Sequence, residues 1–190
     1  MKVVILNAPP ESGKDTIADL MVKHLHATKH EFKAALYQAF ADYYALYLND
    51  AVALCTDRRY KDNTLSVFSK DNHGITPREG LIHVSEKVFK PRHGNDYFGV
   101  KAASKLQEGI NAFADGGGWW DELIPVAMKA EQTIIVRLHR QGYNFDGDSR
   151  DYYNTASMPD CLKGKVIVCD VDLVTGKPYA ALDAIAELLK

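Results

Sequence analysis

The chain has 190 residues, 46% of them hydrophobic and 25% charged, a composition typical of one globular domain and unlike a disordered or fibrous chain. The formal net charge of -2 excludes a strong overall positive field, so nucleic acid is not the expected partner. The three cysteines show no CxxC spacing, which predicts reduced thiols in the cytoplasm and no zinc site. No apolar run approaches the length of a membrane span, so no membrane partner is expected.

The first half of the chain starts with a strand and an amphipathic helix. Residues 2–6, KVVIL, are a continuous apolar run typical of a strand buried on both faces. Apolar residues at helical spacing then predict a helix over about 13–26. The elements expected next are a short strand at 30–34, a long helix at 36–54, a polar excursion at 56–77, a helix at 78–89 and a break at 90–94.

The second half repeats the alternation of helix and strand. Its clearest element is the apolar run TIIVRLH at 133–139, which predicts a buried strand. The other expected elements are a helix at 96–109, strands at 110–114 and 164–170, a helix at 119–130 interrupted near Pro125, a polar stretch at 140–160 and a helix at 179–190.

This alternation predicts an α/β fold with a parallel sheet covered on both faces. We expect a single domain over 1–190, in which two polar excursions, at about 56–94 and 140–160, interrupt the pattern. Ligands of such sheets bind outside the carboxyl ends of the strands, and both excursions follow elements that should end near that edge.

The turn after the first strand matches the phosphate-loop pattern G-x-x-x-x-G-K-[ST] with two departures. Ala8 stands in place of the first glycine, which is tolerable if its φ is negative. Asp15 stands in place of the usual metal-binding hydroxyl, with Thr16 one position later. We interpret Asp15 as either orienting the waters of a bound Mg²⁺ or pointing away. The residues expected to bind the nucleotide are Pro10, Glu11, Ser12, Gly13, Lys14, Asp15 and Thr16.

Two classes of phosphate-loop protein fit poorly. No NKxD-like guanine reader follows a late strand, and the adjacent pair Asp121-Glu122 falls in a predicted helix instead of at a strand end. A kinase with a small acceptor remains, and it needs further cations to hold the acceptor and a cover to exclude water.

The segment SGKDTIAD at 12–19 resembles the phosphate loop of bacteriophage-type deoxynucleoside monophosphate kinases. Residues 76–99 and 136–153 resemble segments of related phage proteins. The resemblance implies a three-layer kinase fold with a five-stranded parallel sheet, an acceptor-binding insertion and a lid. It also implies ATP and Mg²⁺ as cofactors and a deoxynucleoside monophosphate as substrate. The family is often dimeric, so a homodimer is among the partners that the resemblance implies.

Carried onto this sequence, the resemblance gives roles to several cations. Lys14 would hold the ATP phosphates, and Arg140 and Arg150 would be lid cations that stabilise the transferring phosphoryl group; both arginines could instead form surface salt bridges. Arg78 would clamp the acceptor phosphate, with Lys90 and Arg92 adding positive charge, unless these three are solvated charges.

Metal binding is expected at Asp15, Thr16 and Asp115. Asp115 ends a predicted strand before three glycines, where a carboxylate can receive Mg²⁺ through water or bond its own turn. Two other functions stay open. One is a kinase of the same fold that acts on a modified pyrimidine in phage DNA, and the other is a non-catalytic nucleotide-binding module.

Overall fold

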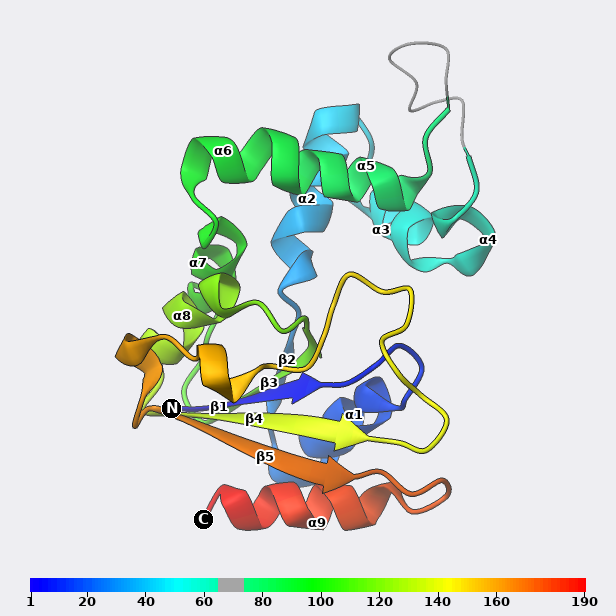
Figure 1. Ribbon diagram of the computed structural model, residues 1–190. Coiled ribbons are helices and arrows are strands. Elements are labelled where there is room, and N and C mark those ends of the chain that lie inside the picture. The colour runs from blue at the N-terminus through cyan, green and yellow to red at the C-terminus, as the bar shows by residue number, and fades with distance from the viewer. Residues whose placement is uncertain (65–73) are drawn as a thin grey trace. The chain divides into compact units, whose positions relative to one another are not determined.

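The computed structural model describes residues 1–64 and 74–190 (Figure 1). Its contacts divide the chain into two compact units, one made of residues 1–32 and 99–190 and the other of residues 33–98. We call them the first unit and the second unit, and each is described by itself.

The first unit is built on a sheet of five parallel strands in the order β2-β3-β1-β4-β5. This confirms the predicted α/β class. The strands are β1 (Lys2–Asn7), β2 (Thr28–His30), β3 (Ile110–Gly116), β4 (Gln132–His139) and β5 (Val166–Asp172). Because β1 lies in the middle, the turn that follows it emerges at the centre of the carboxyl edge.

Both faces of the sheet are covered, as a run of apolar residues without alternation requires. Val3 to Leu6 of β1 are fully buried, and alternate side chains enter two different core clusters. Helices α1 (Lys14–Leu25) and α9 (Pro178–Leu188) cover one face (Figure 1). Helix α8 (Trp120–Lys129) and the end of α7 (Tyr97–Ala103) cover the other.

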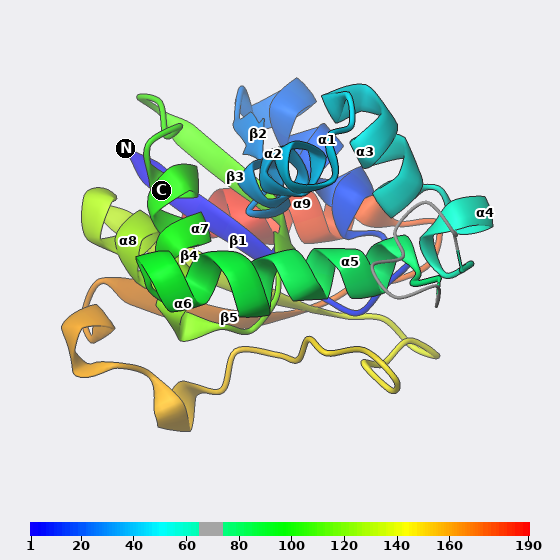
Figure 2. The same ribbon diagram turned by 90° about the horizontal axis from the view of Figure 1, so that it is seen from above.

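The predicted polar stretch at 140–160 is the crossover between β4 and β5. It runs back on the α8 side of the sheet as irregular chain, with two 3₁₀ turns, Thr155–Ser157 and Asp160–Leu162 (Figure 2). Most such crossovers contain a helix, so a polar crossover without one is a candidate for function.

The second unit is helical and has its own core, formed by residues such as Tyr37, Phe40 and Val84. It contains the excursion expected at 56–94, but it starts earlier, at Lys33. Its elements are α2 (Lys33–Tyr44), α3 (Leu48–Thr56), α4 (Arg58–Lys61), α5 (Pro77–His83), a π-helical segment (Val84–Phe89), α6 (Lys90–His93) and the start of α7.

Two predictions for residues 30–54 were wrong. The strand lies at 28–30 instead of 30–34, since helix α2 already begins at Lys33. The single helix predicted over 36–54 is two helices. Ala45 has a left-handed φ of 54°, and the Leu46 amide donates to the Ala41 carbonyl, which closes the first helix. A new helix, α3, then starts at Leu48.

The break predicted at 90–94 was also wrong, because the helical run continues from Pro77 to His93. The Lys90 amide donates to the Ser85 carbonyl, five residues back, in the π-helical segment that precedes Pro91. Pro91 falls in the first turn of α6, where its missing N–H matters least. The run ends at Gly94, which has a φ of 99°.

Other differences are smaller. The helix expected at 96–109 ends at Ala103, and α8 continues through Pro125 without interruption. Within the irregular stretch predicted at 56–77, residues 58–61 form a short helix, and residues 65–73 lie outside the described part of the chain. No helix of the described residues is long and apolar enough to span a bilayer.

Candidate active site

The turn between β1 and α1 wraps around one main-chain carbonyl. The Pro9 carbonyl accepts from the Ser12 amide at 3.4 Å, from the Ser12 hydroxyl at 2.8 Å and from the Lys14 ammonium at 3.1 Å. Two residues of the turn have positive φ, Glu11 at 62° and Gly13 at 107°. The closed turn directly precedes the N-terminus of α1, where main-chain N–H groups favour an anion.

Lys14 belongs to this turn and not to the helix surface. It is 7% exposed, and its ammonium folds back over the loop to the Pro9 carbonyl. A buried ammonium held by a carbonyl is a point charge with a fixed place, which suits an incoming phosphate.

The two departures from the phosphate-loop pattern have different outcomes. Ala8 is fully buried and is not among the residues with positive φ, so its methyl group is accommodated as expected. Asp15 lies 3.6 Å from the ammonium of Lys29, which also bonds Asp19 one turn further along α1 at 2.8 Å. Partial burial opposes the charge of Lys29, but Asp19 and Asp15 outweigh it and raise its pKa. Asp15 therefore points toward β2, which favours the second of its two interpretations.

The fit of this edge to Mg²⁺ rests on few protein ligands. The described residues contain no cluster of three or more His, Cys, Asp or Glu side chains able to hold a metal. Asp115 lies near the end of β3, one residue before the partner of Asn7 in the sheet, and its Oδ1 accepts from the Phe32 amide at 3.0 Å. Mg²⁺ is usually held by one or two protein oxygens together with phosphates and waters, so a cluster of three protein ligands is not required, and metal binding at Thr16 and Asp115 stays a prediction.

Arg140 is brought to the phosphate loop. It directly follows β4, and its guanidinium donates to the Ser12 carbonyl at 3.2 Å and to the Thr175 hydroxyl at 3.2 Å. The same guanidinium lies 4.7 Å from the centre of the Tyr143 ring, within cation–π range. A methyl group on Gly13 would lie 3.7 Å from this guanidinium, so Arg140 stands over the tip of the loop.

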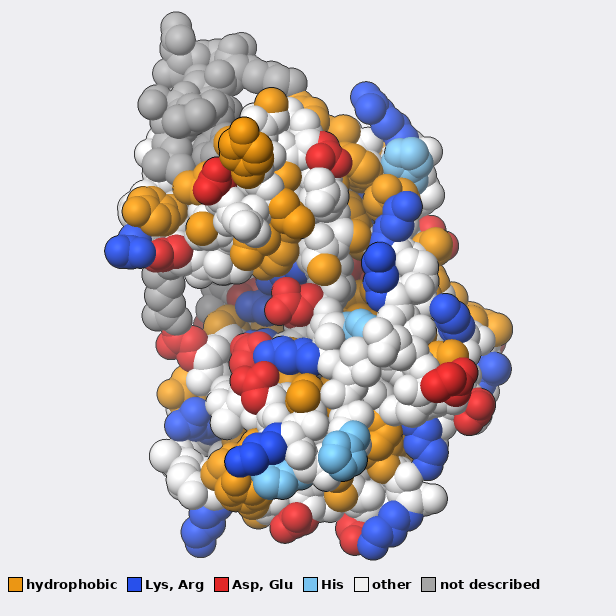
Figure 3. Space-filling model, turned by 180° about the vertical axis from the view of Figure 1, so that it is seen from behind, with side chains coloured by type: hydrophobic (Ala, Val, Ile, Leu, Met, Phe, Trp, Pro, Cys, Tyr) orange, Lys and Arg blue, Asp and Glu red, His pale blue; other side chains and the backbone are white. Residues whose placement is uncertain are grey.

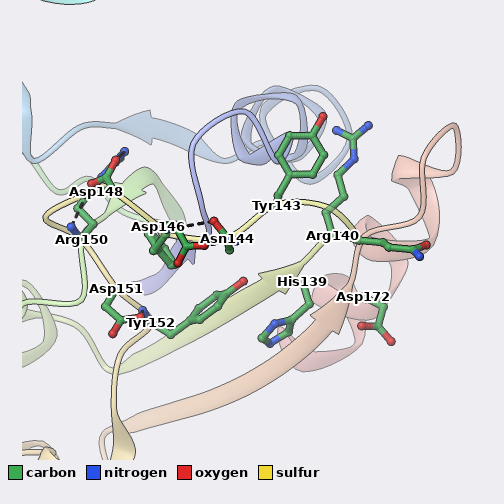
Figure 4. Close-up of a pocket in the computed structure, with 12 residues that line it drawn as sticks. His139, Arg140, Tyr143, Asn144, Asp146, Asp148, Arg150, Asp151, Tyr152 and Asp172 are labelled. Carbon is green, nitrogen blue, oxygen red and sulfur yellow. Dashed lines mark hydrogen bonds and ion pairs between the residues drawn. The ribbon is translucent and has the colours of Figure 1, made fainter.

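Arg150 is not brought to the same place. It forms a two-pronged ion pair with Asp148, at 2.8 and 2.7 Å, and the two side chains are only 13% and 10% exposed. The crossover lines an open pocket of about 700 Å³, and Arg140 and Arg150 lie at its opposite ends (Figure 4).

A second ion cluster lies at the outer edge of the sheet. Arg137 holds Asp170 with two hydrogen bonds, at 2.9 and 2.5 Å, and His139 lies 2.6 Å from the same carboxylate. The Arg137 hydrogen bonds, helped by that of His139, lower the pKa of Asp170. Arg137 is thereby committed to β5 and is not directed at the phosphate loop.

The cations predicted to bind the acceptor all lie in the second unit. Arg78 pairs with Asp62 at 2.7 Å, and Lys90 pairs with Glu86 at 2.7 Å. Arg92 is exposed near the far end of the same helical run. A rise of about 1.5 Å per residue from 78 to 90 separates the two helix positions by roughly 18 Å. The structure therefore does not bring Arg78 together with Lys90 and Arg92.

Sequence reasoning missed three residues at this edge. Tyr143 and Thr175 contact Arg140, and Asn7 bonds the crossover from the end of β1. The only signal for Asn7 is a polar residue that directly ends an apolar strand. Thr175 carries no motif, because its contact with Arg140 joins residues 35 positions apart, and Tyr143 lies only three residues after Arg140 but in a stretch without periodicity.

Comparisons with known proteins give no family. No family model matches the chain, and no curated protein matches it. Among solved structures, a gluconokinase from Sinorhizobium meliloti 1021 is 12% identical with a TM-score of 0.45, and the alignment covers 99% of this chain and 95% of that one. Shikimate kinases from Aquifex aeolicus vf5 and Bacteroides thetaiotaomicron are 12% and 11% identical, each with a TM-score of 0.40. These alignments cover 100% and 98% of this chain, and 96% and 97% of those chains. Identities and scores this low carry no conclusion about what the chain does.

Proposed function

We propose that the protein transfers the γ-phosphate of ATP to the 5′-phosphate of a deoxynucleoside monophosphate. The observation that carries the proposal is the closed turn after β1, in which Pro9, Ser12 and the buried Lys14 form one bonded unit before the N-terminus of α1. Arg140 on the Ser12 carbonyl adds a second cation at the same place. The choice of acceptor rests on the resemblance of residues 12–19 to phage deoxynucleotide kinases.

In this proposal the protein aligns two phosphates and stabilises charge. Lys14 and the main-chain amides of the loop hold the outer phosphates of ATP, and Arg140 and Arg150 stabilise the phosphoryl group in transfer. The acceptor oxygen is already anionic, so no side chain has to act as a general base. When bound, Mg²⁺ supplies further positive charge on the phosphates, and Thr16 and Asp115 are the protein groups proposed to approach it.

The observed charge distribution favours a small acceptor over DNA. The chain has 23 Lys and Arg residues against 25 Asp and Glu. On the face that Figure 3 displays, side chains of both signs are interspersed. A groove for single-stranded nucleic acid needs continuous positive charge and aromatic rings along the strand.

A coupled ADP-release assay tests the proposal. Each deoxynucleoside monophosphate is added to the protein with ATP and Mg²⁺, and we expect ADP that depends on one or more of these acceptors. Turnover only with DNA that contains a modified pyrimidine would replace the proposed acceptor. ATP binding without turnover on any acceptor would reduce the protein to a nucleotide-binding module.

A further inference from the structure

Asn7 is a buried amide whose three hydrogen bonds join three segments. It is fully buried at the end of β1. Its Nδ2 donates to the Gly116 carbonyl at 3.1 Å and to the Asp151 carbonyl at 3.0 Å, while its Oδ1 accepts from the Tyr153 amide at 2.9 Å. Both donors and the acceptor oxygen of the amide are therefore used. A carboxylate in this place would face two carbonyl oxygens, so the site is specific for an amide.

The residues that Asn7 bonds are also held from the opposite side. The Asp151 amide donates to the Gly117 carbonyl at 3.3 Å. Gly118 has a φ of 86°, and a methyl group there would lie 2.4 Å from the Asp151 carbonyl oxygen. The Tyr153 ring is fully buried and lies edge-on to the Trp120 ring at 4.8 Å. Residues 151–153 are thus fixed between the ends of β1 and β3.

This anchor lies directly beside Arg150. At the other end of the same crossover segment, Arg140 is bonded to the phosphate loop. The residues between the two arginines, QGYNFDGDS at 141–149, contain no Lys or Arg. A movement of residues 141–149 therefore brings no positive charge to the phosphate loop. The position of the Arg150 main chain follows from the hydrogen bonds of Asn7 to the residues next to it.

We propose that Asn7 is a positioning residue for phosphotransfer: it fixes the main chain at Asp151 and Tyr153 and so places the guanidinium of Arg150. The role in catalysis rests on the proposed function, but the anchor itself is testable without turnover. Asn7 touches neither phosphate nor nucleoside in this proposal and acts through Arg150.

Hydrogen exchange tests the anchor independently of activity. In Asn7→Ala, exchange of the Tyr153 and Asp151 amides should rise by at least about 10-fold while the β4 amides stay protected. Gly118→Ala keeps Asn7 but places a methyl group against the Asp151 carbonyl, so it should displace the same main chain. Gly164→Ala is its matched control, because Gly164 has a φ of 81° but an added methyl group there meets nothing within 4 Å. Unchanged protection at 151–153 in both Asn7→Ala and Gly118→Ala would overturn the anchor.

A double-mutant cycle with Arg150→Ala tests the link to catalysis. Asn7→Ala and Gly118→Ala should each lower kcat by about 10- to 100-fold, with little change in the KM for ATP. In the Arg150→Ala background neither should lower kcat further, since the residue that they position is gone. Losses that add fully to that of Arg150→Ala would overturn the positioning role.

If Asn7→Ala fails to fold, the Gly118→Ala and Gly164→Ala pair gives the same readout. Absence of turnover in the wild type with every acceptor would refute the proposed function and leave the exchange result standing.

Discussion

Lys14 of the phosphate loop and Arg78 of the helical run at 77–93 are held in opposite ways. In the loop, Lys14 is 7% exposed and bonds a main-chain carbonyl. In the helical run, Arg78 is 42% exposed and pairs with Asp62, whose carboxylate is 57% exposed. Exposed ion pairs contribute about 0–1 kcal/mol and exchange partners readily, whereas a buried charge keeps its place. From this difference we expect Lys14 to keep its place when a ligand binds and Arg78 to leave Asp62 for the ligand.

The largest effect should come from the buried cation. Lys14→Ala should lower turnover by about 10²–10³-fold, because it removes a fixed positive charge at the phosphates. The measurement is acceptor-dependent ADP release, and Lys190→Ala is the control, since Lys190 pairs with Glu187 in an exposed ion pair at the end of α9. Wild-type turnover in Lys14→Ala would contradict the role of the buried Lys14 ammonium as a fixed charge at the phosphates.

A smaller loss of turnover is expected when Arg140, which contacts the loop from the end of β4, is replaced by another cation. Arg140→Lys should lower kcat by about 10-fold, because one ammonium cannot bond both the Ser12 carbonyl and the Thr175 hydroxyl in the manner of a guanidinium. Arg59→Ala is a control, since Arg59 pairs with Asp57 in the second unit. Equal kcat values for Arg140→Lys and the wild type would show that charge alone matters there.

The surface cations should affect acceptor binding and not ATP binding. Arg78→Ala should raise the KM for the acceptor by about 10-fold and leave the KM for ATP unchanged. Since Arg78 and Arg92 lie far apart along one helical run, Arg92→Ala should then have little effect on the same constant. The reverse result would assign the acceptor phosphate to the other end of the run.

The smallest effect concerns stability at the outer edge of the sheet. Because Arg137 and His139 lower the pKa of Asp170, the ion pair stabilises the fold above the ordinary Asp pKa of about 3.9 and loses this contribution as pH falls through the lowered value. Asp170→Asn should therefore destabilise the protein by roughly 1 kcal/mol or less at pH 7, since the pair is half exposed. Urea unfolding at pH 7 and pH 3 checks this, and a difference that grows at low pH would contradict it.

The order of strands and helices in the first unit could be predicted because buried runs such as residues 2–6 and 133–139 leave no polar face. Helix ends in the second unit could not. Ala45 adopts a left-handed conformation that its residue type does not signal, and Pro91 is accommodated by a π-helical segment that depends on packing. Local propensity competes there with tertiary contacts, and the contacts prevail.

The sequence by itself determined the parallel sheet and the place of the phosphate loop, because hydrophobic periodicity and a short local motif act within a few neighbouring residues. Only the tertiary structure decided which charges meet. It turns Asp15 to Lys29, sets Arg140 on the Ser12 carbonyl and bonds Asn7 to Asp151 and Tyr153. Two of these pairings, Arg140 with Ser12 and Asn7 with Asp151, join residues more than a hundred positions apart. The free energy of burying and bonding each polar group therefore depends on the whole packed unit and not on its neighbours in the chain.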